Sequence, residues 1–178
     1  MTRRPPLIAS TAGGPAAAPP LTIGDSYQGG IIAYILQPGD PGYDADVTHG
    51  IIVSTTDVGT GSWGCMGTVI SGADGTALGT GAQNTTDIES GCTTVGTAAD
   101  ICANYTNTDS GTGIYSDWFL PSKDELNKLY ELKVLGFGNF STSYWSSSEY
   151  EGYNFNVGGY AWRQDFSNGS QISGNGKG

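Results

Sequence analysis

The sequence has few charged residues and no apolar run long enough to cross a membrane. Only 13% of its 178 residues are charged, and 7 Lys and Arg stand against 17 Asp and Glu, which gives a net charge of -10. Because like charges repel, this balance argues against binding to phosphate backbones or anionic lipids. We therefore expect no nucleic-acid partner and no membrane insertion.

The sequence also lacks the common patterns of catalytic and zinc sites. The only histidine, His49, has no nucleophile motif nearby, and the serines at 146–148 lack a Gly-x-Ser-x-Gly elbow. The three cysteines lack Cys-x-x-Cys spacing. We expect neither enzymatic activity nor a required cofactor.

One acidic cluster is a weak candidate for a calcium site. Asp40, Asp44 and Asp46 lie beside turn glycines, and oxygen ligands at such spacing could hold Ca²⁺. The spacing does not fit an EF-hand loop, which favours a solvated acidic loop over a metal site.

The three cysteines, an odd number, allow one disulfide and one free thiol. A Cys65–Cys92 bridge would help to pin the Gly- and Thr-rich stretch between 55 and 97. Ala98, Ile101, Cys102 and Tyr105 recur at helical spacing, which predicts a helix over about 94–106. Cys102 on its apolar stripe is favoured as a buried free thiol.

Composition divides the chain into an arm and a domain. Residues 1–21 are rich in Pro, Ala and Gly and predict a flexible arm, whose apolar stretch is too short for a standard signal peptide. Residues 22–178 predict one domain. Two strands are expected at its start, over 31–36 and 50–54.

The stretch Asp117–Leu126 combines several local signals. Trp118 and Leu120 predict a short strand that ends at Pro121. Ser122 and Glu125 form a capping box, so a helix should follow and should end near Gly136.

Strands are expected again over 144–149 and 161–166. In the second, Trp162 and Phe166 should face the core, and Arg163 and Asp165 the other side. Trp118 and Trp145 are also assigned to the core. Asn168-Gly169 predicts a hairpin turn that returns through 170–172. No apolar closing strand follows before Gly178.

Aromatic and polar side chains gather between 150 and 171. Recognition loops use such side chains because rings offer a large rigid area and amides adapt their hydrogen bonds. Each ring could equally cover the core, and both interpretations stay open. The candidate ligand-binding residues are Tyr150, Tyr153, Asn154, Phe155, Asn156, Tyr160, Arg163, Asp165 and Gln171.

Several motifs together resemble a known family. Trp63-Gly64-Cys65, Asp117–Leu126, Tyr144–Glu149 and Ala161–Phe166 occur in the order seen in the C-terminal domain of the Legionella collagen-like adhesin (Lcl-type) family. The pattern is also similar to the variable proteins of diversity-generating retroelements. The resemblance implies an α+β, C-type-lectin-like fold with two helices, small antiparallel sheets and long irregular loops.

The same resemblance implies a function. It implies a homo-oligomer, such as a trimer, that adheres to cell-surface glycans or proteins from an extracellular, cell-surface or virion location. The binding face would be formed by residues 150–171. An alternative is a structural subunit of a phage particle, fibre or filament assembled through the N-terminal arm.

Overall fold

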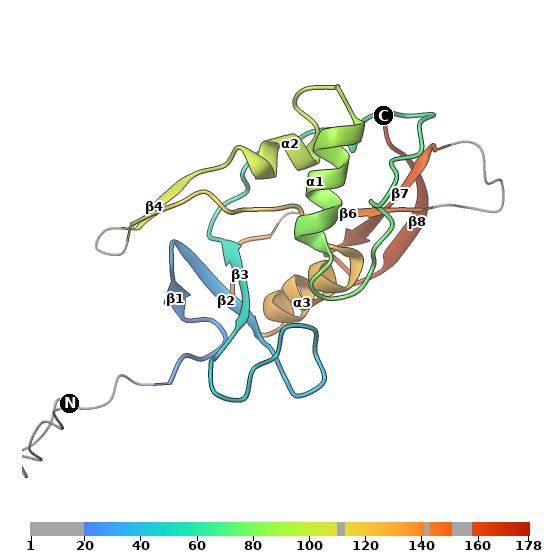
Figure 1. Cartoon of the computed structure of the whole chain (residues 1–178). Helices are drawn as coiled ribbons and strands as arrows, with labels where there is room; N and C mark the ends of the chain where they lie inside the picture. The colour runs from blue at the N-terminus through green and yellow to red at the C-terminus, as the bar shows by residue number, and fades with distance from the viewer. Residues whose placement is uncertain (1–19, 110–112, 141–142, 151–157) are drawn as a thin grey trace, which may run out of the picture.

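The computed structural model describes residues 20–109, 113–140, 143–150 and 158–178. The described chain is an α+β fold with three helices and three small antiparallel sheets. Figure 1 shows α3 (Lys123–Val134) lying between the first sheet and the third, where it contacts β2, β6 and β7. None of the helices in the described residues is long and apolar enough to span a bilayer.

The first sheet confirms both N-terminal strand predictions. It contains β1 (Ser26–Tyr27), β2 (Gly30–Ile35) and β3 (Gly50–Ser54), in the order β1-β2-β3. Ile31 pairs with Val53, and the register shifts between Ile32 and Tyr34. β3 therefore lies at an edge, with β2 as its only strand neighbour in this sheet.

The third sheet contains β6 (Ser143–Glu149), β7 (Tyr160–Asp165) and β8 (Gln171–Gly176), in that order. The expected hairpin is confirmed: Gly169 has a φ of 82°, and its N–H donates to the carbonyl of Asp165 at 2.7 Å. The returning strand runs on to Gly176. The second sheet is a small hairpin of β4 (Asn107–Asp109) and β5 (Gly113–Tyr115), which projects from the body in Figure 1.

α3 is the element that local sequence predicts most completely. The Ser122 side chain accepts from the Glu125 N–H, and the Glu125 carboxylate accepts from the Ser122 N–H, so the capping box is present. Gly136 follows the helix end with a φ of 90°, as expected for a glycine stop.

The expectation of two helices is wrong, because the described residues contain a third, α1 (Gly81–Gly91), inside the Gly- and Thr-rich stretch. Its sequence gives little helical signal: it has Gly at both ends, two threonines and one large apolar residue. Tertiary contacts stabilise it instead. Ile88 is fully buried, and the Asn84 side chain donates to Gly75 O at 2.6 Å and to Ser147 Oγ at 3.2 Å.

The expected strand at 117–120 is also absent from the described sheets. The segment forms no ladder with another strand. The backbone of Leu120 instead bonds to the side chain of Thr85 in α1. The Thr85 Oγ1 accepts from Leu120 N at 3.1 Å and donates to Leu120 O at 3.3 Å. A side chain thus replaces the strand partner that periodicity alone could not identify.

α2 (Ala98–Ala103) confirms the second expected helix over a shorter range. The Cys65–Cys92 disulfide is confirmed, and Cys102 is free and partly buried. The bridge ties the loop after Trp63 to the end of α1.

The core forms two apolar clusters. One surrounds Trp63 and Ile88, and the other surrounds Leu126, Leu132 and Phe166. Phe166 is buried as expected, whereas the expected core tryptophans, Trp118, Trp145 and Trp162, are only partly buried. The register of β7 shifts between Ala161 and Arg163, so simple alternation along this strand fails.

The interior contains a fully buried lysine that the sequence does not predict. Lys177 is 0% exposed, and its Nζ donates to Glu149 Oε1 and, at 2.8 Å, to the carbonyl of Thr68. The same Nζ lies 4.3 Å from the centroid of the Trp63 ring. Glu149 also accepts from the N–H of Ile70 at 2.7 Å. Burial lowers the pKa of Lys177, and the bond to Glu149 opposes that shift.

Removing one member of this pair should strongly destabilise the fold. Lys177→Ala leaves the Glu149 carboxylate buried without its cation, which we expect to lower the free energy of unfolding by about 3–5 kcal/mol. Urea denaturation measures the change through the transition midpoint.

Lys128→Ala is the control for this test. Lys128 is partly exposed, pairs with Glu131 at 3.0 Å and lies 4.6 Å from the Tyr34 ring centroid, so its loss should cost only about 1–2 kcal/mol. Replacing both buried partners, as Lys177→Met with Glu149→Gln, should cost less than the sum of the single changes. Equal costs for Lys177→Ala and Lys128→Ala would contradict the assignment.

Candidate binding face and apolar cavity

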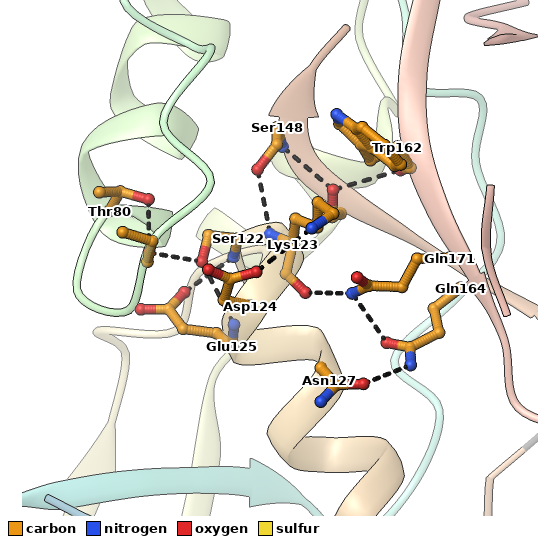
Figure 2. A network of polar contacts seen from close by, with 12 residues as sticks. Thr80, Ser122, Lys123, Asp124, Glu125, Asn127, Ser148, Trp162, Gln164 and Gln171 are labelled. Atoms are coloured by element: carbon orange, nitrogen blue, oxygen red, sulfur yellow. Dashed lines mark hydrogen bonds and ion pairs between the residues drawn. The ribbon is translucent and has the colours of Figure 1, made fainter. Parts of the chain in front are cut away.

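A polar network fixes the start of α3 against the third sheet (Figure 2). The N–H of Lys123 donates to Ser148 Oγ at 3.0 Å, and Ser148 donates to Gly75 O at 2.6 Å. The carbonyl of Lys123 accepts from Gln171 Nε2 at 2.7 Å. Because the partners come from β6, β8 and the loop before α1, the network joins the start of α3 to all three segments.

Glu125 extends this network to α1. Its side chain is 2% exposed, and it accepts from Gly79 N and Ser122 N, both at 2.7 Å. Gly81 lies so close that an added Cβ would overlap the Glu125 carboxylate. The closeness of α1 to the capping box therefore requires glycine at this position.

An aromatic pair lies beside this network. The ring centroids of Tyr150 and Trp162 are 5.3 Å apart at an interplanar angle of 77°, an edge-to-face arrangement. The Nζ of Lys123 lies 5.0 Å from the Trp162 ring, within cation–π distance. Tyr160 is 41% exposed, and its carbonyl accepts from the N–H of Tyr150 at 3.0 Å. We call Tyr150, Tyr160, Trp162 and Lys123 the aromatic face.

The sequence candidates have different environments. Tyr150 and Tyr160 belong to the aromatic face, whereas the amide of Gln171 is used by Lys123 and lies 3.5 Å from Gln164 Oε1. Four further candidates lie outside the described residues: Tyr153, Asn154, Phe155 and Asn156.

Asp165 and Arg163 are partly buried on β7. The Asp165 carboxylate accepts from the side chain and N–H of Ser167, at 2.6 and 2.7 Å, and these bonds hold its pKa below the usual value. Asp165 therefore shapes the hairpin turn. Within the described residues, the buried Nε of Arg163 has no hydrogen-bond partner.

The possible calcium ligands do not converge. Asp40 accepts from Tyr34 OH at 2.8 Å and from Gln37 N at 2.7 Å, and the latter bond is the main cause of its lowered pKa. Asp44 accepts from Asp46 N at 2.8 Å. No group of three metal-ligating side chains occurs among the residues that the structure describes.

The sequence pointed to neither Lys123 nor the buried pair of Lys177 and Glu149. Lys123 is the first residue of α3, and the sequence carries no sign that β7 would bring Trp162 over it. Lys177 stands between glycines, with no apolar neighbour to predict burial. The roles of these residues depend on contacts between segments that are distant in the sequence, which local patterns do not reveal.

A cavity of about 540 Å³ lies between the two apolar clusters. Its walls are formed by β3, the segment 117–121, α3 and the start of β6. Leu120, Trp145 and Cys102 line it from the first cluster, and Leu126 and Phe166 line it from the second. A volume of this size is within the range of ligand-binding cavities.

Burial raises the pKa of the Cys102 thiol to about 11, from an ordinary value of 9.0. Below pH 9.0 both the folded and the unfolded chain carry the protonated thiol. Above it the unfolded chain loses the proton first, so stability falls until the pH reaches the folded pKa. At a pH of about 10 we expect a loss of about 1 kcal/mol.

Urea denaturation of the wild type and of Cys102→Ser, at neutral and alkaline pH, measures this loss. All other ionisable groups are common to both proteins, so the difference between them isolates the thiol. An identical alkaline loss in both would contradict a buried thiol.

In comparisons with known proteins, no family model, no curated protein and no solved structure matches the chain.

Proposed function

We propose that this chain is a recognition domain that binds a cell-surface glycan or protein through the face formed by residues 150–171. The observation that carries the proposal is the aromatic face: an edge-to-face ring pair, a cation over one ring and an exposed tyrosine. Rings present large rigid area at low entropy cost, and sugars pack their apolar faces against rings.

The support beneath this face suits recognition. Partly buried hydrogen bonds of Ser148 and Gln171 hold the start of α3 against β6 and β8, so Lys123 needs little ordering of its backbone when a ligand binds. A binding surface that is already ordered loses less entropy on association. This is the physical advantage of placing rings beside a fixed helix end.

We further infer a C-type-lectin-like arrangement, an extracellular or particle-surface location and assembly as a homo-oligomer. The small antiparallel sheets, the long loops and the placement of α3 between two sheets support the fold assignment. The Cys65–Cys92 disulfide supports an oxidising location.

Binding of the full chain to glycan arrays and to whole cells tests the proposal. We expect Tyr160→Ala to weaken binding about tenfold, as for loss of a contact worth about 1.4 kcal/mol. Tyr150→Ala should act in the same direction, because it also removes the ring that supports Trp162.

Tyr43→Ala is the matched control, since Tyr43 is 40% exposed but lies in the β2–β3 connection. Circular dichroism should show all three variants folded. Binding that survives both face variants, or that falls equally with Tyr43→Ala, would overturn the proposed face.

A further inference from the structure

The apolar cavity follows an unpaired strand edge. Residues 48–54 and 56–58 line it, so it runs along the whole of β3. Among the described strands, β3 pairs only with β2, and Ile51, Ile52 and Val53 are only partly buried. An apolar edge strand that stays uncovered invites pairing with another segment.

These features favour an extended peptide as the occupant. A peptide can both fill an apolar cavity with side chains and pair its backbone with the free edge of β3, as in strand addition. A small apolar molecule could fill the space but could not satisfy backbone groups along an edge.

The charged residues that line the cavity indicate which charge the peptide should carry. The exposed Asp117 lines it, as does Asp57, whose carboxylate accepts from Tyr144 OH at 2.6 Å, and no lysine or arginine does so within the described residues. The fitting segment is therefore aliphatic with a basic flank.

We propose that the cavity binds the aliphatic run Leu7-Ile8-Ala9 of this same chain, as a strand added to β3. This run is preceded by Arg3 and Arg4, two of the 7 basic residues. It lies in residues 1–19, outside the described part of the chain. The proposal goes beyond the proposed function and does not depend on it.

The chain connection makes this docking feasible within one molecule. Leu21 itself lines the cavity, so the arm starts at its wall. The residues between Ala9 and Leu21 can span up to about 36 Å when extended. The tether also keeps the local concentration of the run high, which favours its own cavity over that of a second copy.

Leu7 and Ile8 are the residues to test. Leu7→Asp with Ile8→Asp, in the full chain, places charges where the apolar contacts should form. We expect the amides of β3 to exchange hydrogen at least about tenfold faster than in the wild type, because the edge loses its partner. Fluorescence of the apolar dye anilinonaphthalene sulfonate should rise several-fold as the cavity opens.

Ala16→Asp with Ala17→Asp is the matched control, since it adds the same charge to the same arm outside the aliphatic run. It should leave β3 exchange and dye binding at wild-type values. Exchange in α3 should stay unchanged in every variant and serves as an internal reference for folding. Equal β3 exchange in the wild type and the Leu7 and Ile8 variant would overturn the proposal.

Dye binding and sedimentation separate the other occupants. Strong dye binding by the wild type would show an open cavity and overturn the proposal. Protection of β3 that grows with protein concentration, together with a rising sedimentation mass, would place the arm in a second copy and overturn the intramolecular form. Concentration-independent protection supports it.

Discussion

The fold depends on a buried charge that its surroundings must neutralise. Lys177 is fully buried, so its ammonium group must find partners inside the protein. It finds Glu149 at the end of β6, the carbonyl of Thr68 and the ring of Trp63. These partners come from distant parts of the sequence. The ammonium group therefore joins the irregular 60–70 loop to the third sheet, together with the bond from Trp63 Nε1 to Ser146 O at 2.9 Å and the burial of the Trp63 and Ile70 side chains.

The same principle operates at the start of α3, with neutral and acidic groups in place of an ion pair. Glu125 is buried and accepts from Gly79 and from its own N-cap residue, and Ser148 joins Lys123 to Gly75. The long Gly-rich connection is thus held by hydrogen bonds and a disulfide as well as by the buried side chains of Trp63 and Ile70. Trp162 and Tyr150 lie beside this point, so the aromatic face is built on one of the most constrained parts of the molecule.

Local chemistry made part of this structure predictable. Ser122 and Glu125 specify a helix start within four residues, and Asn168-Gly169 specifies a hairpin, so α3 and the β7–β8 turn followed from sequence alone. α1 did not, because Asn84 and Thr85 act through partners in other segments. The strand expected at 117–120 is absent for a similar reason, because the partner of Leu120 is the Thr85 side chain and not another strand. In the proposed binding face the tyrosines were predictable by composition, but the place of Lys123 beside Trp162 depended on contacts between α3 and β7.

The cavity between the two apolar clusters lowers the stability of the fold, because no described residue fills it. Ile51 and Val53 pack against the second cluster but stay partly exposed, while Leu120 belongs to the first cluster and Trp145 packs against it. Most of its walls are aliphatic or aromatic, although Asp57 and Asp117 also line it, so apolar groups fill most of this space more favourably than polar ones. Further apolar atoms would close it, at a gain of about 25 cal/mol for each Å² buried. The cavity and the aromatic face thus differ in physical character, and the two proposals differ accordingly: an aliphatic strand for the cavity, and an outside ligand for the rings and the cation.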